Sequence, residues 1–311
     1  MTFRCFIAAA LATTFAVVSL TACGGGRGRS SGAEDGPNVV ATTSQVGDLA
    51  RNVAGDRALV TQILRPNSDP HEYEPRPSDV KAVTKAAVVL RSGGDLDEWL
   101  GDVLDNAGSE ASVVTLIDAM RTRRLPGEVD PHWWQNPRNG AIAVLKIRDA
   151  LIAADPDGRD TYTKNATAYL KQLDTLDREI ESCIDSVLEQ DRKLVTDHDT
   201  LGYYADRYAI DVIGTIIPGL STQAQPSAGG VARLARTIRK ENVKTVFSEG
   251  SVNRKLADAI ARDSGARVGP SLYADTLGPK GSPGDTYLGS LKANTRALSA
   301  GFTNGKARCQ L

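Results

Sequence analysis

Short apolar runs alternate with helix-forming stretches along most of this 311-residue chain. The runs are typical of buried strands and lie at 38–43, 58–64, 86–93, 112–117, 193–198, 209–216, 244–250 and 266–273. Most segments between them have the spacing of amphipathic helices, beginning with 44–54, for which we expect Ser44 to be the N-cap. Strands that alternate with helices form mostly parallel sheets covered by helices, so the sequence predicts an α/β fold.

The alternation is interrupted by a stretch from 157 to 190 that predicts one long helix. Apolar residues recur there at intervals of three and four, and the stretch contains no proline. At 1.5 Å per residue, roughly thirty residues span about 45 Å, enough to cross a molecule of two lobes. A chain of 311 residues also exceeds what one hydrophobic core usually fills. We expect a first lobe at 38–137, a helical connection at 138–190 and a second lobe at 191–311.

Residues 1–22 have the layout of a secretory signal. Arg4 precedes an apolar run that is too poorly flanked for a membrane-spanning helix. The sequence LTAC at 20–23 resembles the lipobox of bacterial lipoproteins, in which the cysteine is lipidated and becomes the first mature residue. An ordinary secretory signal with an incidental cysteine is the alternative. We expect lipidation at Cys23, a flexible tether over 23–37, and a protein anchored on the outer side of the cell membrane.

The composition of the chain gives no sign of nucleic-acid binding, and its cysteines suggest a disulfide. The net charge is −1 and aromatic residues make up 5% of the chain, so neither charge nor base stacking points to nucleic acid.

After removal of the signal and lipidation of Cys23, the remaining cysteines are Cys183 and Cys309. In an oxidising compartment these two can form a disulfide that ties the C-terminal tail to a helix, and two buried free thiols are the alternative.

The chain has three histidines, and two of them follow the dipeptide Asp-Pro. The motif SDPHEYEP contains His71 and the motif DPHWWQNP contains His132, while His198 ends the run KLVTDH. All three lie beyond the carboxyl ends of predicted strands, where open α/β sheets build ligand sites. Proline stiffens the backbone around the first two, so little loop entropy remains to be lost when they bind a ligand.

Three imidazoles at equivalent positions predict a metal site, because neutral imidazole is the commonest nitrogen ligand of zinc and similar metals. A single loop histidine is more often solvated or hydrogen-bonded, and the combination of three favours the metal. A fourth ligand would be a carboxylate just after a strand, either Asp275 in LYADTLG or Glu249 in FSEG. The spacing does not choose between these two carboxylates.

Together these motifs resemble the metal-binding cluster A-I substrate-binding proteins of bacterial ABC importers, which deliver zinc or manganese. The resemblance rests on DPHEYEP, DPHWWQNP, VTDHDTLGYYADRY, FSEG, NRKLADAIARDSGARV and LYADTLG, and extends from about residue 38 to 302. It implies two α/β lobes, each a mostly parallel sheet flanked by helices, joined by one long rigid helix with the metal in the cleft. The implied ligands are His71, His132, His198 and Asp275. The implied partner is an ABC permease with its ATPase, and we expect the protein to be a monomer.

Two departures from the family pattern bear on the identity of the metal. Many zinc-specific members carry a long His-rich acidic loop between the first two ligand histidines, whereas the stretch 117–130 is short and contains no histidine. Manganese members commonly have Glu where this chain has His198, and three nitrogens with one carboxylate suit zinc better than manganese. We expect Zn²⁺ as the bound substrate, with Mn²⁺ or mixed-metal binding as the alternative.

Carboxylates next to the ligands in sequence or across the cleft are candidates for orienting the histidines. The candidates are Asp69, Asp130, Asp197 and Glu249. Trp133 and Trp134, next to His132, are candidates for apolar walls that keep water off the site; the alternative is that at least one of them belongs to the core of the lobe. Because protons compete with metal for imidazole, we expect affinity to fall as the histidines titrate near pH about 6.5.

A secreted zinc hydrolase is the competing class of protein, since a zinc site can expose a bound water. Catalytic zinc usually has three protein ligands and an open position, and the sequence has no H-E-x-x-H motif. Four protein ligands therefore favour a binding protein over an enzyme. The family contains proteins once named adhesins, so a surface adhesin is a third hypothesis.

Overall fold

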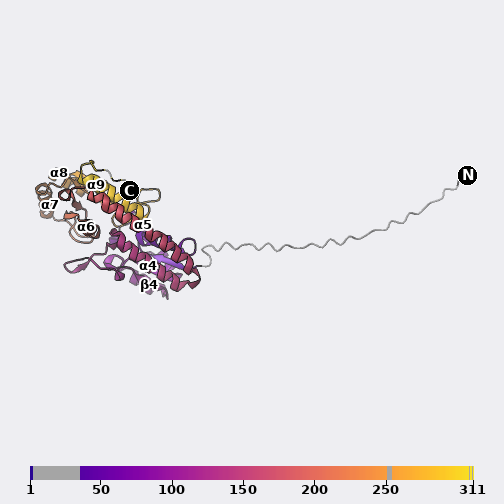
Figure 1. The fold of residues 1–311 in the computed structure, drawn as a ribbon. Helices are drawn as coiled ribbons and strands as arrows, with labels where there is room; N and C mark the ends of the chain where they lie inside the picture. Colours follow the sequence, from indigo (N-terminus) through magenta and orange to yellow (C-terminus); the bar gives the residue numbers. More distant parts are fainter. Residues whose placement is uncertain (3–35, 251–253, 308, 310) are drawn as a thin grey trace. The chain divides into compact units, whose positions relative to one another are not determined.

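The computed structural model describes residues 1–2, 36–250, 254–307, 309 and 311. The expected signal at 1–22, the expected lipidation at Cys23 and most of the expected tether lie outside the described residues. From residue 36 onward the described chain packs as one compact unit (Figure 1). Among its described helices, none combines the length and the hydropathy needed to cross a bilayer.

A parallel sheet of four strands forms the centre of the first lobe, the part of the chain from β1 to α4. In sheet order the strands are β2 (Leu59–Gln62), β1 (Asn38–Ala41), β3 (Val88–Arg91) and β4 (Ser112–Thr115). The apolar side chains of β1 and β3 are buried, as expected for central strands that helices cover on both faces. Val40 of β1 lies opposite Thr61 of β2 and Val89 of β3. All four carboxyl ends therefore meet at one edge of the sheet.

Two layers of helices cover this sheet. One face is covered by α2 (Pro77–Thr84) and α3 (Leu100–Ala107), and the other by α1 (Ser44–Ala54) and α4 (Pro137–Ala154). The alternation of side chains along β3 accounts for both layers. Val89 packs with Val83 and Leu100 under α2 and α3, whereas Val88 and Leu90 belong to the larger core beneath α1 and α4.

The first helix is capped by a different residue from the one that the sequence predicted. The side chain of Thr43, not Ser44, accepts the hydrogen bond from the backbone N–H of Val46. Ser44 is the first helical residue, and its Oγ accepts a hydrogen bond from the backbone N–H of Leu277, 2.9 Å away. The prediction was wrong by one position because Ser44 is used for a contact with a distant loop that no local pattern encodes.

The long helix α5 (Arg159–Asp185) has 27 residues and spans about 40 Å. Its buried residues recur at intervals of three and four and contact α1 and α4 of the first lobe as well as α9 (Tyr287–Phe302) of the second. It ends earlier than predicted because the N–H groups of Ser186 and Val187 bond to carbonyls three residues back, on Cys183 and Ile184. In Figure 1, α5 lies beside α4 at one end and α9 at the other.

The second lobe, from β7 to α9, repeats the arrangement of the first. Its strands are β7 (Lys193–Thr196), β8 (Asp211–Thr215), β9 (Thr245–Val246) and β10 (Arg267–Val268). Strand β7 pairs with β8 and β9 with β10, both in parallel, and a 2.9 Å hydrogen bond from Phe247 N to Val195 O joins the two pairs. The resulting order β8-β7-β9-β10 matches the order β2-β1-β3-β4 of the first lobe. The predicted α/β fold of two lobes joined by a long helix is confirmed.

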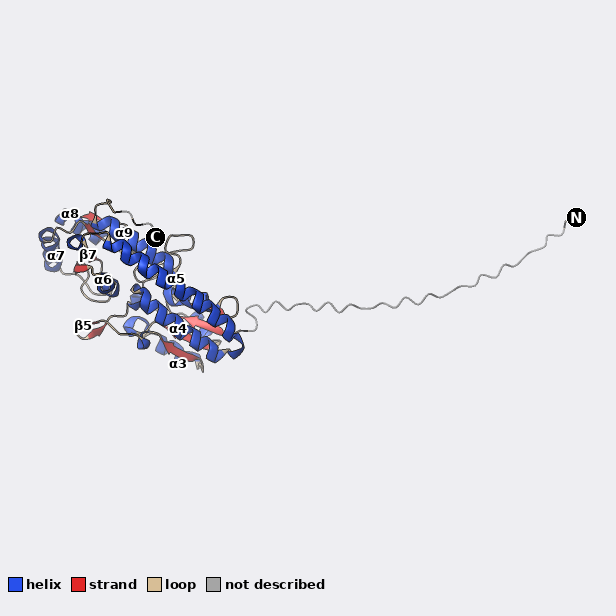
Figure 2. Cartoon of the chain, in the orientation of Figure 1, coloured by secondary structure: helices blue, strands red, loops and turns tan. Residues whose placement is uncertain are grey.

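Helices surround the second sheet as well, and Figure 2 shows the short strands of the molecule framed by helices. The helices are α6 (Gly202–Tyr208), α7 (Ala228–Lys240), α8 (Lys255–Ser264) and α9. A separate apolar core, which includes Val195, Ile238 and Ile260, lies between the strands and the helices α7 and α8. This packing leaves the loops after β7 and β10 free to face the first lobe.

Short elements complete the fold. The 3-10 helices are η1 (Pro70–Glu72), η2 (Gly94–Asp97), η3 (Ile117–Ala119), η4 (Trp133–Gln135), η5 (Pro156–Gly158) and η6 (Glu189–Asp191). A small antiparallel hairpin of β5 (Arg124–Leu125) and β6 (Glu128–Val129) lies within the short stretch 117–130 between the first two histidines. Its turn contains Gly127, whose φ of 87° is accessible to glycine and costly for other residues.

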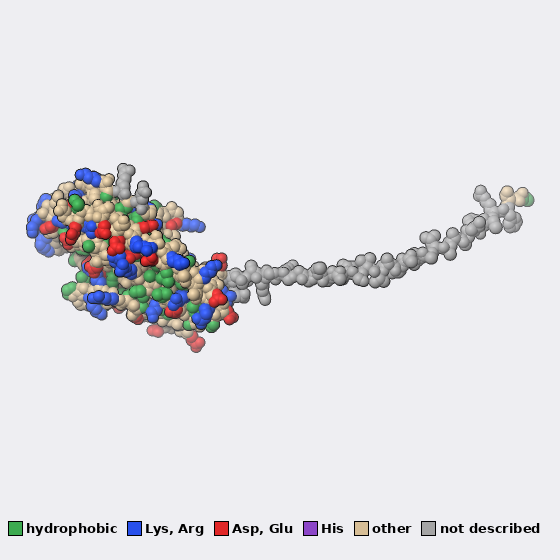
Figure 3. Space-filling model, viewed as in Figure 1, with side chains coloured by type: hydrophobic (Ala, Val, Ile, Leu, Met, Phe, Trp, Pro, Cys, Tyr) green, Lys and Arg blue, Asp and Glu red, His purple; other side chains and the backbone are tan. Residues whose placement is uncertain are grey.

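The end of the chain is attached to α5 by a disulfide. Cys183, in the last turn of α5, is bonded to Cys309, and their Cα atoms are 5.4 Å apart. The bond spans 126 residues and so encloses the second lobe. On the face shown in Figure 3, acidic and basic side chains are interspersed, in keeping with the net charge of −1.

Candidate metal centre

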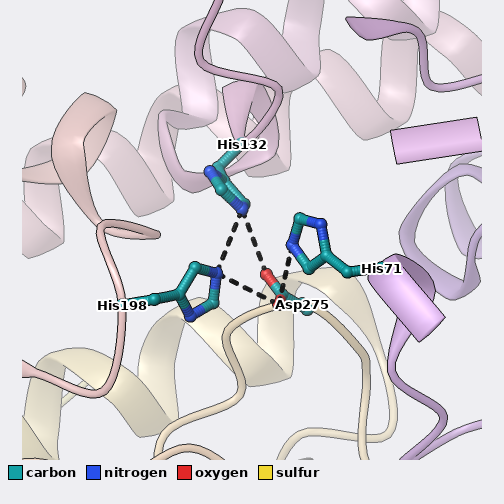
Figure 4. A group of neighbouring side chains, drawn as sticks. All are labelled: His71, His132, His198 and Asp275. Atoms are coloured by element: carbon teal, nitrogen blue, oxygen red, sulfur yellow. Dashed lines mark hydrogen bonds and ion pairs between the residues drawn. The ribbon is translucent and has the colours of Figure 1, made fainter. Parts of the chain in front are cut away.

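The three histidines and Asp275 converge on one point (Figure 4). His71 lies in η1 and His132 directly precedes η4, both in the first lobe. His198 follows β7, and Asp275 follows the strand region of β10 in the second lobe. One ligand atom from each of the four lies within 4.8 Å of the others. Two segments of each lobe therefore contribute to a single cluster.

The spacing of the facing atoms matches a small tetrahedral cation. The Nε2 atoms of His132 and His198 are 3.3 Å apart, and Asp275 Oδ1 is 3.4 Å from the former. Asp275 Oδ2 is 3.3 Å from His198 Nε2 and 3.5 Å from His71 Nε2. Four ligands at about 2.0–2.1 Å from a tetrahedral zinc ion are separated by about 3.3–3.4 Å. These separations involve both oxygens of Asp275, and the full set of one atom per residue extends to 4.8 Å, so the side chains must draw together somewhat to reach that arrangement.

The cluster is buried and leaves polar atoms without hydrogen bonds. His132, His198 and Asp275 are at most 2% exposed, and the side chain of His71 is 7% exposed. His71 Nε2 and Asp275 Oδ2 make no hydrogen bond within the described part of the chain. Buried polar atoms without partners are costly, and a cation at the centre would satisfy them together. The donor set thus fits a bound divalent metal.

His71 is held through its backbone. Asp69 Oδ1 accepts a hydrogen bond from the N–H of His71 at 2.9 Å and caps the short helix η1. The other oxygen of Asp69 accepts a hydrogen bond from Thr222 Oγ1 of the second lobe at 2.8 Å. Gln223 also donates to the carbonyl oxygen of His71. Asp69 therefore fixes the loop of His71 rather than its imidazole, and ties it to the second lobe.

His132 is oriented by a buried carboxylate. Its Nδ1 lies 2.8 Å from Asp130 Oδ1, and its backbone N–H donates to the same oxygen at 3.0 Å. Burial would raise the pKa of Asp130, but the hydrogen bonds from His132 outweigh it and lower that pKa. An ionised carboxylate only accepts hydrogen bonds, so Nδ1 carries the proton and the Nε2 lone pair faces the centre.

Glu249 is the carboxylate next to the Nδ1 atom of His198. Glu249 Oε1 lies 2.9 Å from His198 Nδ1, on the side of the ring away from the centre. Asp197 Oδ2 accepts a hydrogen bond from the backbone N–H of Glu249 at 2.7 Å and does not contact an imidazole directly. Of the two carboxylates left open by the sequence, Asp275 lies at the centre and Glu249 behind a histidine.

The carboxylates determine the protonation of the centre in the absence of metal. Burial alone would lower the pKa of His198, but Glu249 and Asp275 outweigh it and raise that pKa to about 10. Burial raises the pKa of Glu249 to about 7 and that of Asp197 to about 6. Burial would also raise the pKa of Asp275, but the surrounding histidines, His198 foremost, lower it well below its usual range. The centre thus attracts positive charge, either a proton or a metal ion.

Several contacts of the site were not foreseen from the sequence. Thr200 Oγ1 donates to Asp275 Oδ1 at 3.1 Å. Trp134 Nε1 and Gln135 Nε2 both donate to the carbonyl oxygen of Ala274 at 2.9 Å. Trp134 and Gln135 fix the loop of Asp275 from the first lobe, and Thr200 fixes it from within the second. Only their nearness in sequence to His132 and His198 could have indicated these donors.

The two tryptophans have different roles. The ring of Trp134 lies 5.4 Å from the ring of His132, centroid to centroid and edge-on, and so forms part of the wall of the site. Trp133 is fully buried in the core and donates its Nε1 hydrogen to Ser92. Trp134 belongs to the same buried core, so both tryptophans are core residues and Trp134 in addition lines the site.

The fold and a cluster of four side chains that could hold a metal ion are features of a substrate-binding protein for metal transport. A family profile described as "zinc-uptake complex component A, periplasmic" matches residues 39–301, and the chain belongs to this family. Its members are binding components of metal ABC importers and not enzymes, and they act with a membrane permease and an ATPase.

Relatives with assigned names differ in their metal. The manganese-binding lipoprotein MntA of Halalkalibacterium halodurans is 33% identical over 292 residues, covering 92% of this chain and 96% of the relative. The iron ABC transporter substrate-binding lipoprotein MtsA of Streptococcus pyogenes is 30% identical over 306 residues, covering 94% and 97%. Among solved structures, the periplasmic zinc-binding protein TroA of Treponema pallidum has a TM-score of 0.81 and 26% identity, covering 86% of this chain and 99% of that one.

Proposed function

We propose that this protein captures Zn²⁺ between its lobes, with His71, His132, His198 and Asp275 as the ligands, and delivers it to an ABC permease. The observation that carries the proposal is the convergence of four buried side chains, with one ligand atom from each within 4.8 Å of the others and with Asp275 oxygens 3.3–3.5 Å from all three Nε2 atoms. A small shift of these side chains would bring four donors to tetrahedral zinc–ligand distances.

The ligand chemistry favours zinc over manganese and iron. Three imidazole nitrogens and one carboxylate are typical of zinc, whereas manganese prefers oxygen-rich sites with more ligands. Glu249, the other carboxylate near the centre, is turned toward His198 Nδ1 and so does not supply a second oxygen ligand. The relatives are named for manganese, iron or zinc, so membership of the family supports binding of a divalent metal. The donor set of this chain supports zinc as that metal.

The proposal also includes the location and state of the protein. We propose a monomer attached by lipid at Cys23 to the outer side of the membrane, where it meets its permease. The LTAC motif supports the anchor, and both MntA and MtsA are named lipoproteins. Extracytoplasmic location also agrees with the Cys183–Cys309 disulfide, since such bonds persist in oxidising compartments.

A chelator-competition titration of metal-free residues 24–311 with zinc and with manganese tests the proposal. Zinc should bind one-to-one and more tightly than manganese, and both His71→Ala and Asp275→Ala should weaken it strongly. Asp263→Ala is the matched control, because this carboxylate is exposed on α8 away from the cluster, and it should bind zinc like the wild type. Tighter binding of manganese would contradict the choice of metal, and weak binding of both metals would contradict the function.

A further inference from the structure

Arg123 lies behind the metal centre, next to the hairpin β5–β6, and contacts both lobes. Its Nη1 donates to Asp130 Oδ2 at 2.9 Å and to Asp199 Oδ1 at 3.4 Å, and its Nη2 donates to Asp199 Oδ2 at 3.5 Å. Its side chain is only 19% exposed. A single guanidinium therefore bridges a carboxylate of the first lobe and one of the second.

Each of these carboxylates belongs to a residue next to a proposed metal ligand, in space for Asp130 and in sequence for Asp199. Asp130 uses its other oxygen to hold Nδ1 of His132. Asp199 is the residue after His198, and its backbone N–H donates to the carbonyl oxygen of Gly219 at 3.1 Å, which holds the loop in place. Arg123 thus links the partner of one ligand with the loop of another, across the boundary between the lobes.

The surroundings of Arg123 are shaped to hold it. A Cβ atom added to Gly202 would lie 2.3 Å from Cζ of Arg123, so the guanidinium packs on bare backbone at the start of α6. The hydroxyl of Tyr203 accepts a hydrogen bond from the backbone N–H of Arg123 at 2.9 Å and donates to the carbonyl oxygen of Asp130 at 3.0 Å. Arg123 is therefore held by close packing and by backbone hydrogen bonds as well as by its ion pairs.

Charge gives Arg123 a second effect. Besides Asp130 and Asp199, the exposed carboxylate of Asp206 lies 3.4 Å from its Nε. Without the guanidinium, a fully buried carboxylate and a mostly buried one would face each other with no cation between them, and their repulsion would separate the lobes at this point. A lysine would restore the charge but not the forked geometry that reaches both carboxylates.

We propose that Arg123 is a positioning residue for metal binding, which holds His132 and the loop of His198 in register across the two lobes. The inference rests on the proposed zinc site. Arg123 does not touch the metal; it acts through Asp130 and Asp199. Because these contacts join the two lobes around the site, loss of Arg123 should mainly increase the rate at which zinc dissociates.

The test compares Arg123→Gln with Arg124→Gln in the chain from residue 24 to 311. Arg124 is the next residue, is exposed, and carries the same charge, so it is a matched control. Arg123→Gln should weaken zinc binding about 10- to 100-fold, the range found when partners of metal ligands are removed, with most of the change in the dissociation rate. Arg124→Gln should stay within about twofold of the wild type, and Arg123→Lys should recover part of the affinity.

A double-mutant cycle with Asp199→Asn separates positioning from general destabilisation. If Arg123 acts partly through Asp199, then Arg123→Gln should cost less affinity in the Asp199→Asn background than in the wild type. The melting temperature of each metal-free variant shows that the compared proteins are folded. Equal zinc affinity and dissociation rate for Arg123→Gln and Arg124→Gln, or strictly additive effects in the cycle, would overturn the inference alone. Failure of the wild type to bind zinc would overturn the proposed function and the inference with it.

Discussion

Zinc binding at neutral pH should displace a proton from His198. In the metal-free protein, Glu249 and Asp275 overcome the effect of burial and raise the pKa of His198 to about 10. At pH 7.5 both ring nitrogens of His198 therefore carry hydrogen, and Nε2 must lose its hydrogen before it can bind metal. A histidine with the ordinary pKa of about 6.5 would be almost fully deprotonated at pH about 7.5, so protons would no longer compete with zinc there. For His198 that competition should continue to higher pH.

The size of the effect follows from the distance between the pKa and the pH of the experiment. With a pKa of about 10, the proton reduces zinc affinity at pH 7.5 by a factor on the order of 100 or more relative to the deprotonated site. Affinity should rise about tenfold per pH unit between pH about 7 and 9, and one proton should leave His198 for each zinc bound at pH about 7.5.

The stability of the metal-free protein should change with pH in the opposite direction. The folded pKa of His198 is raised above its unfolded value of about 6.5. Its contribution to the free energy of unfolding is therefore fully present below pH about 6.5 and is lost as the pH rises through about 10. Low pH favours the closed metal-free centre, and high pH favours the metal-bound one.

Isothermal titration calorimetry in buffers with different ionisation enthalpies counts the released protons directly. Chelator competition from pH 6.5 to 9, corrected for protonation of the chelator, gives the slope of affinity against pH. Glu249→Gln is the internal comparison, because removal of this carboxylate should lower the pKa of His198 and reduce the proton release at pH 7.5. An affinity that is flat above pH 7.5, with no proton release in any buffer, would refute the reasoning.

Three other predictions concern the support of the site and of the second lobe. Asp130→Asn should weaken zinc binding about 10- to 100-fold in chelator competition, because Nδ1 of His132 loses its charged acceptor, and unchanged affinity would contradict its role. Replacement of Cys183 and Cys309 by serine should lower the free energy of unfolding in urea by about 4–5 kcal/mol, because the bond closes a loop spanning 126 residues, and a loss below about 1 kcal/mol would argue against this contribution. Zinc at a hundred times its dissociation constant should raise the free energy of unfolding by about 2.7 kcal/mol, and manganese at the same concentration should raise it less.

The repeated α/β pattern was predictable from the sequence because its cause is local. Valine-rich runs that are buried on both faces, such as Val39 with Val40, have few alternatives to a central parallel strand. The apolar spacing of α5 likewise predicted a long helix, since one face of it is buried along its whole length. The hairpin around Gly127 was missed because its strands are two residues each, too short to show a period.

The candidate site was predictable only in part. Three rare histidines at strand ends were visible in the sequence, but the choice between Asp275 and Glu249 depended on which carboxylate reaches the centre in three dimensions. The same holds for Arg123, whose partner Asp199 lies 76 residues away in sequence and in the other lobe. Such contacts arise from the packing of one lobe on the other, which no local pattern records.

A crystal of the zinc-loaded protein, measured on both sides of the zinc absorption edge, tests the central claim most directly. The account predicts one strong anomalous peak between the lobes, about 2.0–2.1 Å from one nitrogen of each of His71, His132 and His198 and from one oxygen of Asp275. A principal peak elsewhere, or a peak in this cluster that Glu249 ligates in place of one of the four, would contradict it.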